Sequence, residues 1–269
     1  MPLVVCPTPI GNLEDVTLRV LRELGTADLV LCEDTRRTRV LLDRHGVSAR
    51  LTSYHRHNEA RRTAEILPRL VAGERIALAS DAGLPALNDP GARLVVAALD
   101  AGLEVSVLPG PSAVETALVA SGLIGDRYLF LGYLPRTRAG LTRLWDELTG
   151  VAYPVVAFES ARRLGGSLAS LAEVQSERPV AVCRELTKRF EEVVRGSAAE
   201  LAARFATPPK GEITVVIAGS PRGRADSTDR DALESVSQLV AAGVPRREAV
   251  ALVARLTGLP RNRLYRASL

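Results

Sequence analysis

Short apolar runs alternate with longer stretches of helical spacing along most of the chain. Runs of only a few hydrophobic residues predict buried strands, and an apolar residue at every third or fourth position predicts a helix. Expected strands cover residues 3–6, 28–32, 51–53, 75–79, 104–108, 128–134, 154–158, 179–183, 191–195 and 212–218. Expected helices cover residues 16–24, a segment ending near 44, 60–71, 92–101, 113–120, 140–148, 162–171, 198–205, 231–242, 246–257 and a short final segment.

The regular alternation of strand and helix predicts an α/β fold with largely parallel sheets flanked by helices. Polar stretches at 135–138 and 220–228 indicate two linkers. We therefore expect an N-terminal α/β lobe over 1–134, a C-terminal α/β lobe over 135–222 and a small helical tail over 223–269. The short helices and tight turns of the tail resemble a helix-turn-helix. The alternative is a helical cap on the second lobe.

Two local signals predict where particular helices begin and end. Gly25 is expected to end the first helix, because glycine readily adopts the left-handed conformation found after helices. Ser112 is expected to cap the helix that follows it, with Glu115 completing a capping box.

A loop rich in glycine, proline and aspartate, residues 79–91, follows one expected strand and precedes an expected helix. Loops at the carboxyl ends of strands are where open α/β sheets bind ligands. Gly83 and Gly91 allow a close approach of backbone to a ligand. Asp81 is suited to hold a hydroxyl group or a cation. The alternative is an ordinary strand-to-helix turn.

Composition indicates an ordinary soluble globular protein. The chain has 269 residues, of which 46% are hydrophobic and 25% charged. No apolar run approaches the roughly 20 residues of a membrane span, and the N-terminus resembles a first strand rather than a signal peptide. The cysteines and histidines are too few and too scattered for a disulfide framework or a zinc site. We expect a reducing cytoplasm, no membrane and no metal.

Positive charge is concentrated in two segments. Nine arginines but only three acidic residues lie between positions 36 and 69, and six arginines face a single glutamate between 244 and 269. Such segments favour a polyanionic partner such as nucleic acid. The alternative is a solvated surface in a chain that prefers arginine, since Lys188 and Lys210 are its only lysines.

Several motifs, in this order along nearly the whole chain, resemble the tetrapyrrole methylase superfamily of S-adenosylmethionine-dependent methyltransferases. They are the loop leading into residues 15–19, residues 27–31, the Asp81 loop and residues 109–113. Further motifs resemble the ribosomal RNA small subunit methyltransferase I family within it: residues 8–13, 33–36, 58–59, 158–160, 183–188, 210–212 and 264–265. The chain departs from that family's pattern at Leu84, at Asn88 and at residues 161–163.

The resemblance implies a two-lobed fold, S-adenosylmethionine as cofactor and a homodimer. It also implies methylation of the 2′-oxygen of a cytidine ribose in the decoding region of 16S rRNA, in the small ribosomal subunit. Two alternatives stay open: methylation of a tetrapyrrole ring carbon, and a non-catalytic RNA-binding factor for ribosome assembly.

The resemblance also suggests which residues bind the cofactor. They are Pro9, Gly11, Asp81, Ala82, Gly83, Pro85, Pro109, Gly110, Ser112, Ala113, Cys183 and Gly211.

A ribose hydroxyl is weakly acidic, so a proton acceptor should help. The candidate catalytic residues are Lys188, Asp34 and Glu185, with Asp81 also considered as an acceptor. Lys188 stands out because a lysine, unlike an arginine, can lose its proton when desolvated. A phosphate contact or an ordinary surface cation is its alternative, and an ion pair with Arg36 is the alternative for Asp34.

The candidate contacts to substrate RNA are Arg36, Arg37, His57, Glu59, Glu159 and Arg163. Capping of the following helix is an equal possibility for Glu59. Tyr54 is suited to stack on a base, although packing in the core is the more common role of a lone tyrosine.

Overall fold

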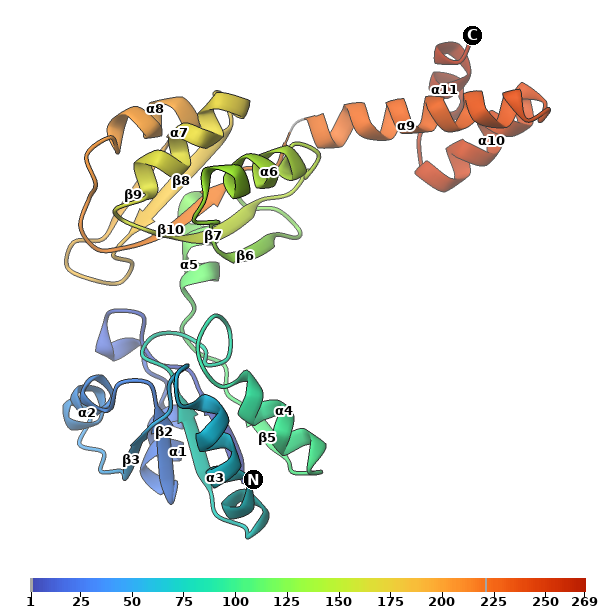
Figure 1. Cartoon of the computed structure of the whole chain (residues 1–269). Helices are drawn as coiled ribbons and strands as arrows, with labels where there is room; N and C mark the ends of the chain where they lie inside the picture. Colours follow the sequence, from blue (N-terminus) through green and yellow to red (C-terminus); the bar gives the residue numbers. More distant parts are fainter. Residues whose placement is uncertain (1, 221) are drawn as a thin grey trace. The chain divides into compact units, whose positions relative to one another are not determined.

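The computed structural model describes residues 2–220 and 222–269. Side chains are described for all of these residues except 222–230. The structure contains two β-sheets flanked by helices (Figure 1). Each sheet has five strands. Contacts divide the chain into two compact units, and each is made of more than one segment. The first unit comprises Met1–Gly122, Val182–Val193 and Gly211–Thr214, and the second comprises Leu123–Ala181, Val194–Lys210 and Val215–Leu269.

The first sheet has the strand order β3-β2-β4-β1-β5, and its neighbouring strands run parallel. Its carboxyl ends therefore share one edge, where open α/β sheets bind ligands. The strands are β1 (Leu3–Cys6), β2 (Leu29–Cys32), β3 (Leu51–Ser53), β4 (Ile76–Ala79) and β5 (Val105–Val107).

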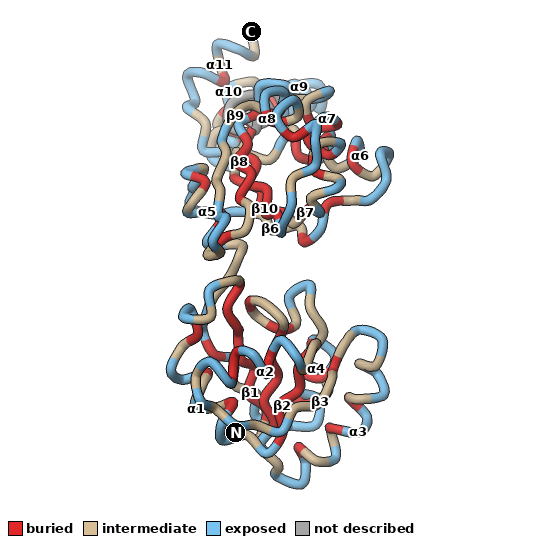
Figure 2. Tube along the Cα trace, turned by 90° about the vertical axis from the view of Figure 1, so that its left-hand side faces the viewer, coloured by how far each residue is buried: buried red, intermediate tan, exposed pale blue. Residues whose placement is uncertain are grey.

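Helices cover both faces of the first sheet, because alternate strand residues point to opposite sides. Val4 and Cys6 join one core cluster with α1 (Leu18–Thr26) and α2 (Thr35–Arg44). Leu3 and Val5 join another with α3 (Glu59–Val71) and α4 (Ala92–Asp100). The central strands are accordingly buried along their length (Figure 2). A short 3₁₀ helix, Leu13–Asp15, and α5 (Ala113–Ser121) complete the helices of this unit.

The second sheet has the order β6-β7-β10-β8-β9. The strands are β6 (Leu129–Tyr133), β7 (Val155–Ser160), β8 (Pro179–Arg184), β9 (Glu192–Ser197) and β10 (Glu212–Ile217), and the helices are α6 (Arg138–Leu148), α7 (Leu164–Gln175) and α8 (Ala198–Arg204). The expected boundary at residue 134 would assign β6 to the first lobe. Its hydrogen bonds instead join it to β7 in the second sheet, and the two contact units divide after Gly122.

Three helices form the tail: α9 (Arg222–Ala241), α10 (Arg246–Thr257) and α11 (Arg261–Ala267). They have a small core of their own, made by Ala232, Val236, Ala249, Val250, Val253 and Leu264. The linker expected over 220–228 is largely helical from Arg222 onward, and its residue 221 lies outside the described residues. Within the part of the chain that the structure describes, no helix is both long and apolar enough to cross a membrane.

One expected helix end is wrong, and one expected helix start is correct but lacks its expected capping hydrogen bond. Gly25 lies inside α1, which runs to Thr26 and begins after Thr17, whose hydroxyl accepts from Val20 N at 3.1 Å. Ser112 occupies the N-cap position of α5 as expected, but its hydroxyl donates to the Glu115 carboxylate instead of accepting from the backbone, so the capping box does not form.

Candidate active site

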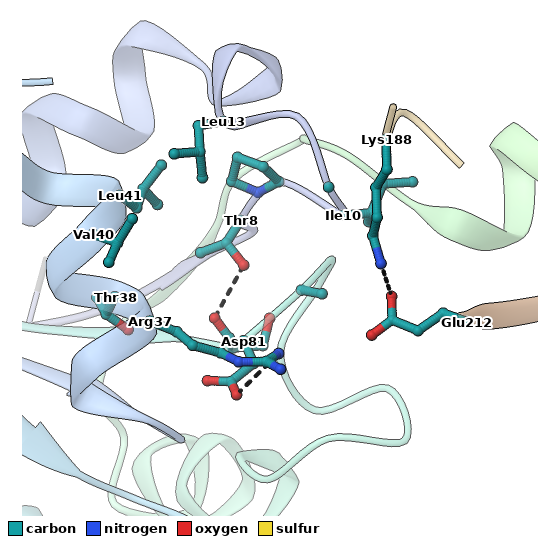
Figure 3. A pocket seen from close by; sticks show the side chains of 14 residues that line it. Thr8, Ile10, Leu13, Arg37, Thr38, Val40, Leu41, Asp81, Lys188 and Glu212 are labelled. Atoms are coloured by element: carbon teal, nitrogen blue, oxygen red, sulfur yellow. Dashed lines mark hydrogen bonds and ion pairs between the residues drawn. The ribbon is translucent and has the colours of Figure 1, made fainter. Parts of the chain in front are cut away.

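A cavity of about 330 Å³ lies in the first unit, where chain segments leave the carboxyl edge of the first sheet (Figure 3). Its walls come from the loop after β1, the start of α2, the loop after β4, and the two later segments that join this unit. The lining residues are Thr8, Pro9, Ile10, Gly11, Leu13, Arg37, Thr38, Val40, Leu41, Ser80, Asp81, Ala82, Lys188 and Glu212.

The loops after β1 and β4 are tied together at the base of the cavity. Thr8 and Gly83 exchange two backbone hydrogen bonds, each of 2.9 Å, and the Thr8 hydroxyl donates to Ser80 O at 3.0 Å. The Ser80 hydroxyl donates to Gly83 O at 2.8 Å. Gly83 has φ +77°, a conformation that favours glycine. These bonds fix the backbone of Ser80 and Ala82 against the cavity.

The Asp34 carboxylate accepts a hydrogen bond from the backbone at the start of α2 and pairs with an arginine. It accepts from Arg36 N at 2.9 Å and pairs with the Arg36 guanidinium at 2.7 Å. The hydrogen bond from the Arg36 side chain lowers the pKa of Asp34 to about 2. Such a carboxylate is a poor proton acceptor at neutral pH, so the geometry favours the ion-pair alternative. Its backbone N–H donates to Asp81 Oδ1 at 2.9 Å and thereby orients Asp81.

Asp81 brings negative charge to the cavity wall. Its second oxygen, Oδ2, lies 3.6 Å from Arg37 Nη1 (Figure 3). Both residues are among those predicted for the site, and the fold places them on one cavity although they are far apart in sequence.

Lys188 is held between two carboxylates. Its Nζ donates to Glu185 Oε1 at 2.9 Å. It also donates to Glu212 Oε2 at 2.7 Å (Figure 3). Partial burial lowers the pKa of Lys188, but the hydrogen bonds and charges of Glu212 and Glu185 outweigh it and leave the pKa raised. The hydrogen bond from Lys188 in turn lowers the pKa of Glu185. Lys188 is therefore held as an ammonium ion, which does not suit the expected role of proton acceptor.

The turn that carries Lys188 is strained and tightly packed. Glu185 has φ +50° and Thr187 has φ +64°, which non-glycine residues seldom adopt. Asn12 N donates to Thr187 Oγ1 at 2.9 Å and holds the turn against the loop after β1. A β-carbon on Gly11 would lie 2.5 Å from Lys188 Cγ, and one on Gly211 would lie 2.5 Å from Glu185 Cγ. Both predicted glycines are thus required for close packing around Lys188.

The loop after β4, residues 80–91, is anchored by Glu59. This residue was expected to contact RNA or to cap its helix. The Glu59 carboxylate accepts from Gly91 N at 2.9 Å, and Gly91 has φ +137°. Within the loop Pro85 is buried, and Ala86 and Asn88 also have positive φ values. Glu59 therefore has a positioning role inside the first unit, which a sequence motif does not reveal.

Asp89, in the same loop, has an unusual environment. Burial is the largest effect and, with the nearby charges of Glu33 and Asp81, raises the pKa of Asp89 to about 7. The loop thus carries a carboxyl group that titrates close to neutral pH.

The remaining predicted cofactor residues lie outside the residues that line this cavity. Pro109 and Gly110 follow β5, and a β-carbon on Gly110 would lie 2.5 Å from Pro7 Cγ, so glycine allows this loop to approach the loop after β1. Ser112 and Ala113 lie at the start of α5. Cys183 is buried, with its Sγ 3.7 Å from Ala117 O.

The Glu159 carboxylate is not accessible to an RNA molecule. Its side chain is fully buried in the second unit, where it accepts from Ser160 N at 2.6 Å, from Arg163 Nε at 2.9 Å and from Ser167 Oγ at 2.5 Å. Arg163 also donates to Leu134 O at 3.1 Å. The expected contact of Glu159 with RNA is wrong for this reason.

Arg36, Arg37 and His57 are exposed and stay predictions as RNA contacts. Tyr54 is buried and bonded to Thr63 at 2.8 Å, as its core alternative requires. The sequence offered no reason to single out Thr38, Leu41 or Ser80, because small polar and apolar residues at a cavity wall have no motif of their own. Glu212 directly follows Gly211 within the motif 210–212, which gives no separate signal for its contact with Lys188.

Comparisons with known proteins identify the family. The model of the family described as "Tetrapyrrole (Corrin/Porphyrin) Methylases" matches residues 2–202, and that of the "RsmI C-terminal HTH domain" matches residues 227–269. A ribosomal RNA small subunit methyltransferase I from Mesorhizobium japonicum is 45% identical, with 98% of this chain and 90% of that protein covered. Its counterpart from Thermotoga maritima is 43% identical, covering 81% of this chain and 98% of that protein. The chain belongs to the ribosomal RNA small subunit methyltransferase I family.

Solved structures agree with this fold. A uroporphyrin-III C-methyltransferase from Thermus thermophilus superimposes with a TM-score of 0.57 at 22% identity, covering 81% of this chain and 94% of that one. A diphthine synthase superimposes with a TM-score of 0.64 at 15% identity, covering 80% and 89%. The expected tetrapyrrole-methylase-like α/β fold is confirmed.

As a member of this family, the chain is an S-adenosylmethionine-dependent methyltransferase. The cavity suits a ligand of this kind in two respects. About 330 Å³ lies at the lower end of the range for small-molecule sites, and the Asp81 carboxylate matches a ligand that carries cationic groups. Among the described residues, no group of histidine, cysteine and acidic side chains is arranged to hold a metal ion.

Proposed function

We propose that this chain methylates the 2′-oxygen of a cytidine ribose in the decoding region of 16S rRNA, within the small ribosomal subunit. The observation that carries the proposal is the cavity in which the Asp81 loop meets the Lys188–Glu185–Glu212 cluster. Support for an RNA substrate comes from the relatives, which are named ribosomal RNA small subunit methyltransferases. The exposed Arg36 and Arg37 beside the cavity fit a polyanionic substrate.

We assign cofactor binding to the backbone and side chains of the loops after β1, β4 and β5. Pro9, Gly11, Asp81 and Ala82 line the cavity itself, and the bonds between Thr8 and Gly83 hold their loops in place. S-adenosylmethionine supplies an electrophilic methyl group when bound. What the protein must then do is align and activate the attacking oxygen.

The Lys188 ammonium activates the ribose hydroxyl in this proposal. A fixed positive charge beside a hydroxyl favours its deprotonated form, and charge stabilisation of this kind is strong at a preorganised site. Glu185 keeps Lys188 in place. Glu212, whose carboxylate lines the same cavity and is mostly exposed, accepts the proton. Asp34 acts indirectly, by orienting Asp81 through its backbone N–H.

Transfer of labelled methyl from S-adenosylmethionine to unmodified small ribosomal subunits tests this function directly. We expect label in 16S rRNA, recovered after digestion as 2′-O-methylcytidine. Label in another nucleotide or position would contradict the proposal. If the protein binds the cofactor but leaves RNA unlabelled, a small-molecule substrate is favoured. If it does not bind the cofactor, a role as an assembly factor is favoured.

Substitutions in the cluster test the mechanism within the same assay. Lys188→Met and Glu212→Gln should lower the rate of transfer by roughly 100-fold or more, while cofactor binding measured by calorimetry is retained. The matched control is Lys210→Met, which replaces the only other lysine and lies outside the cavity lining. Equal rates for Lys188→Met and the unchanged protein would overturn the role of Lys188.

We also propose that the enzyme is a homodimer that acts in the cytoplasm, as the family resemblance implies. Light scattering of the purified protein gives the mass that tests the dimer. A monomeric mass at working concentration would reject it.

A further inference from the structure

Arg189 and Phe190 directly follow Lys188 and are both exposed. The Phe190 side chain is a large aromatic group with 66% of its surface open to solvent. The Arg189 guanidinium lies 5.6 Å from the centre of the Phe190 ring. A single exposed apolar residue is ordinary in itself, but this one sits beside the proposed catalytic cluster and carries a cation on its ring.

A second hollow of about 460 Å³ adjoins the active-site cavity. Both are lined by Gly11, Leu13 and Lys188, so they meet at these residues. The other residues that line the second hollow are Asn12, Glu14, Arg44, Thr187 and Arg189. The space beside the proposed catalytic cluster therefore continues as far as Arg189, which precedes Phe190 in the chain, all of it within the first unit.

The charge of this second hollow is mostly positive, and part of it is uncompensated. Arg44 pairs with Glu14 at 3.1 Å, and Lys188 pairs with its two carboxylates. Arg189 has no carboxylate within ion-pair distance among the residues that the structure describes. Its charge is thus available to an anion outside the protein.

The backbone that presents the pair is held rigid. Thr187 N donates to Glu191 Oε2 at 2.7 Å, and Glu191 N donates to Lys188 O at 3.0 Å, closing the turn around Arg189 and Phe190. Preorganised contact residues lose less conformational entropy on binding. The turn therefore offers a stable aromatic face and a fixed cation next to the site of reaction.

We propose that Arg189 and Phe190 bind the RNA nucleotide adjacent to the methylated one. Phe190 stacks on its base, and Arg189, with Arg44 across the hollow, holds the phosphate that joins the two nucleotides. Single-stranded RNA is recognised by such stacking on aromatic side chains and by arginine contacts. This inference rests on the proposed RNA substrate and adds a binding subsite to it.

Methyl transfer to unmodified small subunits, measured as a function of subunit concentration, tests the subsite. Phe190→Ala should raise KM for the subunit about 10-fold, with kcat and the Kd for S-adenosylmethionine nearly unchanged. Phe190→Trp should keep the KM of the unchanged protein, whereas Phe190→Leu, apolar but not aromatic, should not. Equal KM values for Ala, Leu and Phe at position 190 would overturn the stacking role.

A matched control is available in the second unit. Arg127 lies 4.5 Å from the centre of the Tyr153 ring, so it forms a similar cation–aromatic pair that lines neither hollow. Tyr153→Ala and Arg127→Ala should leave KM unchanged. If Tyr153→Ala raises KM as much as Phe190→Ala does, the effect is not specific to the subsite and the proposal fails.

A binding measurement separates failure of the subsite from failure of the proposed reaction. In Phe190→Trp the new indole is exposed, while the natural Trp145 is 1% exposed and gives a steady background. A short single-stranded RNA from the decoding region should quench the added fluorescence, and Tyr153→Trp should show no such quenching. Quenching without methyl transfer would retain the subsite and reject the reaction. Methyl transfer without quenching would reject the subsite.

Discussion

At position 11, the absence of a side chain determines how closely two parts of the site approach. A β-carbon there would lie 2.5 Å from Lys188 Cγ and 2.9 Å from Leu186 O. The lysine side chain can move aside, but the carbonyl belongs to the backbone of the strained turn. Any larger residue at position 11 must therefore displace the turn that holds Lys188.

Gly11→Ala should accordingly lower the rate of methyl transfer by roughly 10- to 100-fold, because misplacing a catalytic group by about 1 Å has effects of this size. Gly166→Ala is the control, since a β-carbon on Gly166 meets nothing within 4 Å and alanine favours a helix. The rates of both variants on small subunits are compared. A Gly11→Ala enzyme as fast as the control would show that the turn tolerates displacement.

Asp89 predicts a pH dependence of stability. Its pKa is about 7 in the folded chain against an ordinary value of 3.8. The folded state therefore keeps the carboxyl protonated while the unfolded chain ionises, so stability falls as pH rises between these two values. Asp89→Asn removes this loss. Its melting temperature should be close to that of the unchanged protein at about pH 4 and clearly exceed it at about pH 8.

The exposed Asp100 in α4 provides the comparison for Asp89. Asp100→Asn, the same change at an exposed position, should show no such increase in melting temperature between about pH 5 and about pH 8. A constant difference between Asp89→Asn and the unchanged protein over the same range would contradict the raised pKa.

The sequence predicts which residues lie at the site, but not their protonation states or their burial. Lys188 stands out because the chain otherwise uses arginine, yet its protonation depends on Glu185 and on Glu212, which reaches it from the start of β10. Glu159 fits an exposed acidic motif and a buried one equally well in sequence, and only its contacts with Ser167 and Arg163 distinguish them. Such facts depend on tertiary neighbours that no local pattern contains.

Strands and helices themselves follow closely from the apolar pattern. β1, β3 and α10 have their expected bounds, and other elements differ mainly at their ends. The pattern did not indicate which sheet a strand joins: β6 is an apolar run like the others, and its pairing with β7 depends on distant residues. The helix start at Leu18 depends on the Thr17 cap, which competes with the apolar signal of Val16.

Arg178 connects several elements of the second unit. It is buried, its Nε donates to Ala218 O at 2.6 Å and its Nη1 donates to Leu148 O at 3.3 Å, so it ties the end of α6 to the residue after β10. Arg178→Met should lower the free energy of unfolding by about 2–4 kcal/mol, because buried carbonyl groups lose their donor. Urea unfolding measures the change.

Arg138→Met provides the reference for Arg178. Arg138 lies in the same unit and is largely exposed, in an ion pair with Glu173 at 2.8 Å. Exposed pairs contribute little, so a change within about 0.5–1 kcal/mol is expected. Equal losses in the two variants would mean that the carbonyl contacts of Arg178 do not stabilise the unit.

Over the whole molecule, arginine is distributed unevenly. The segment from 36 to 69 contributes Arg36 and Arg37 beside the cavity, and the other basic segment forms most of α10 and α11. The charge pattern predicted a polyanionic partner, and the family's relatives act on RNA by name. The charge pattern does not predict which arginines contact such a partner, because many arginines also pair with carboxylates of the protein.

Binding to small subunits should weaken steeply as salt is raised, since phosphate contacts release counterions. Three exposed arginines of the tail, Arg247, Arg255 and Arg261, are replaced together by uncharged residues. The slope of log K against log salt should then fall by roughly one for each RNA phosphate that these arginines contact. The same number of substitutions at paired arginines, Arg22, Arg75 and Arg138, is the control. An unchanged slope in the tail variant would place the tail away from RNA.

The cavity of the first unit takes one of its walls from late in the chain. Residues up to Gly122 contain all five strands of its sheet, but Lys188 and Glu212 arrive with the segments 182–193 and 211–214. During synthesis, domains fold from the N-terminus onward as chain becomes available. A nascent chain can therefore complete this sheet while the wall is still missing. If Lys188 and Glu212 act as proposed, we expect activity only after residue 212 has left the ribosome, and partly synthesised chains should be inactive.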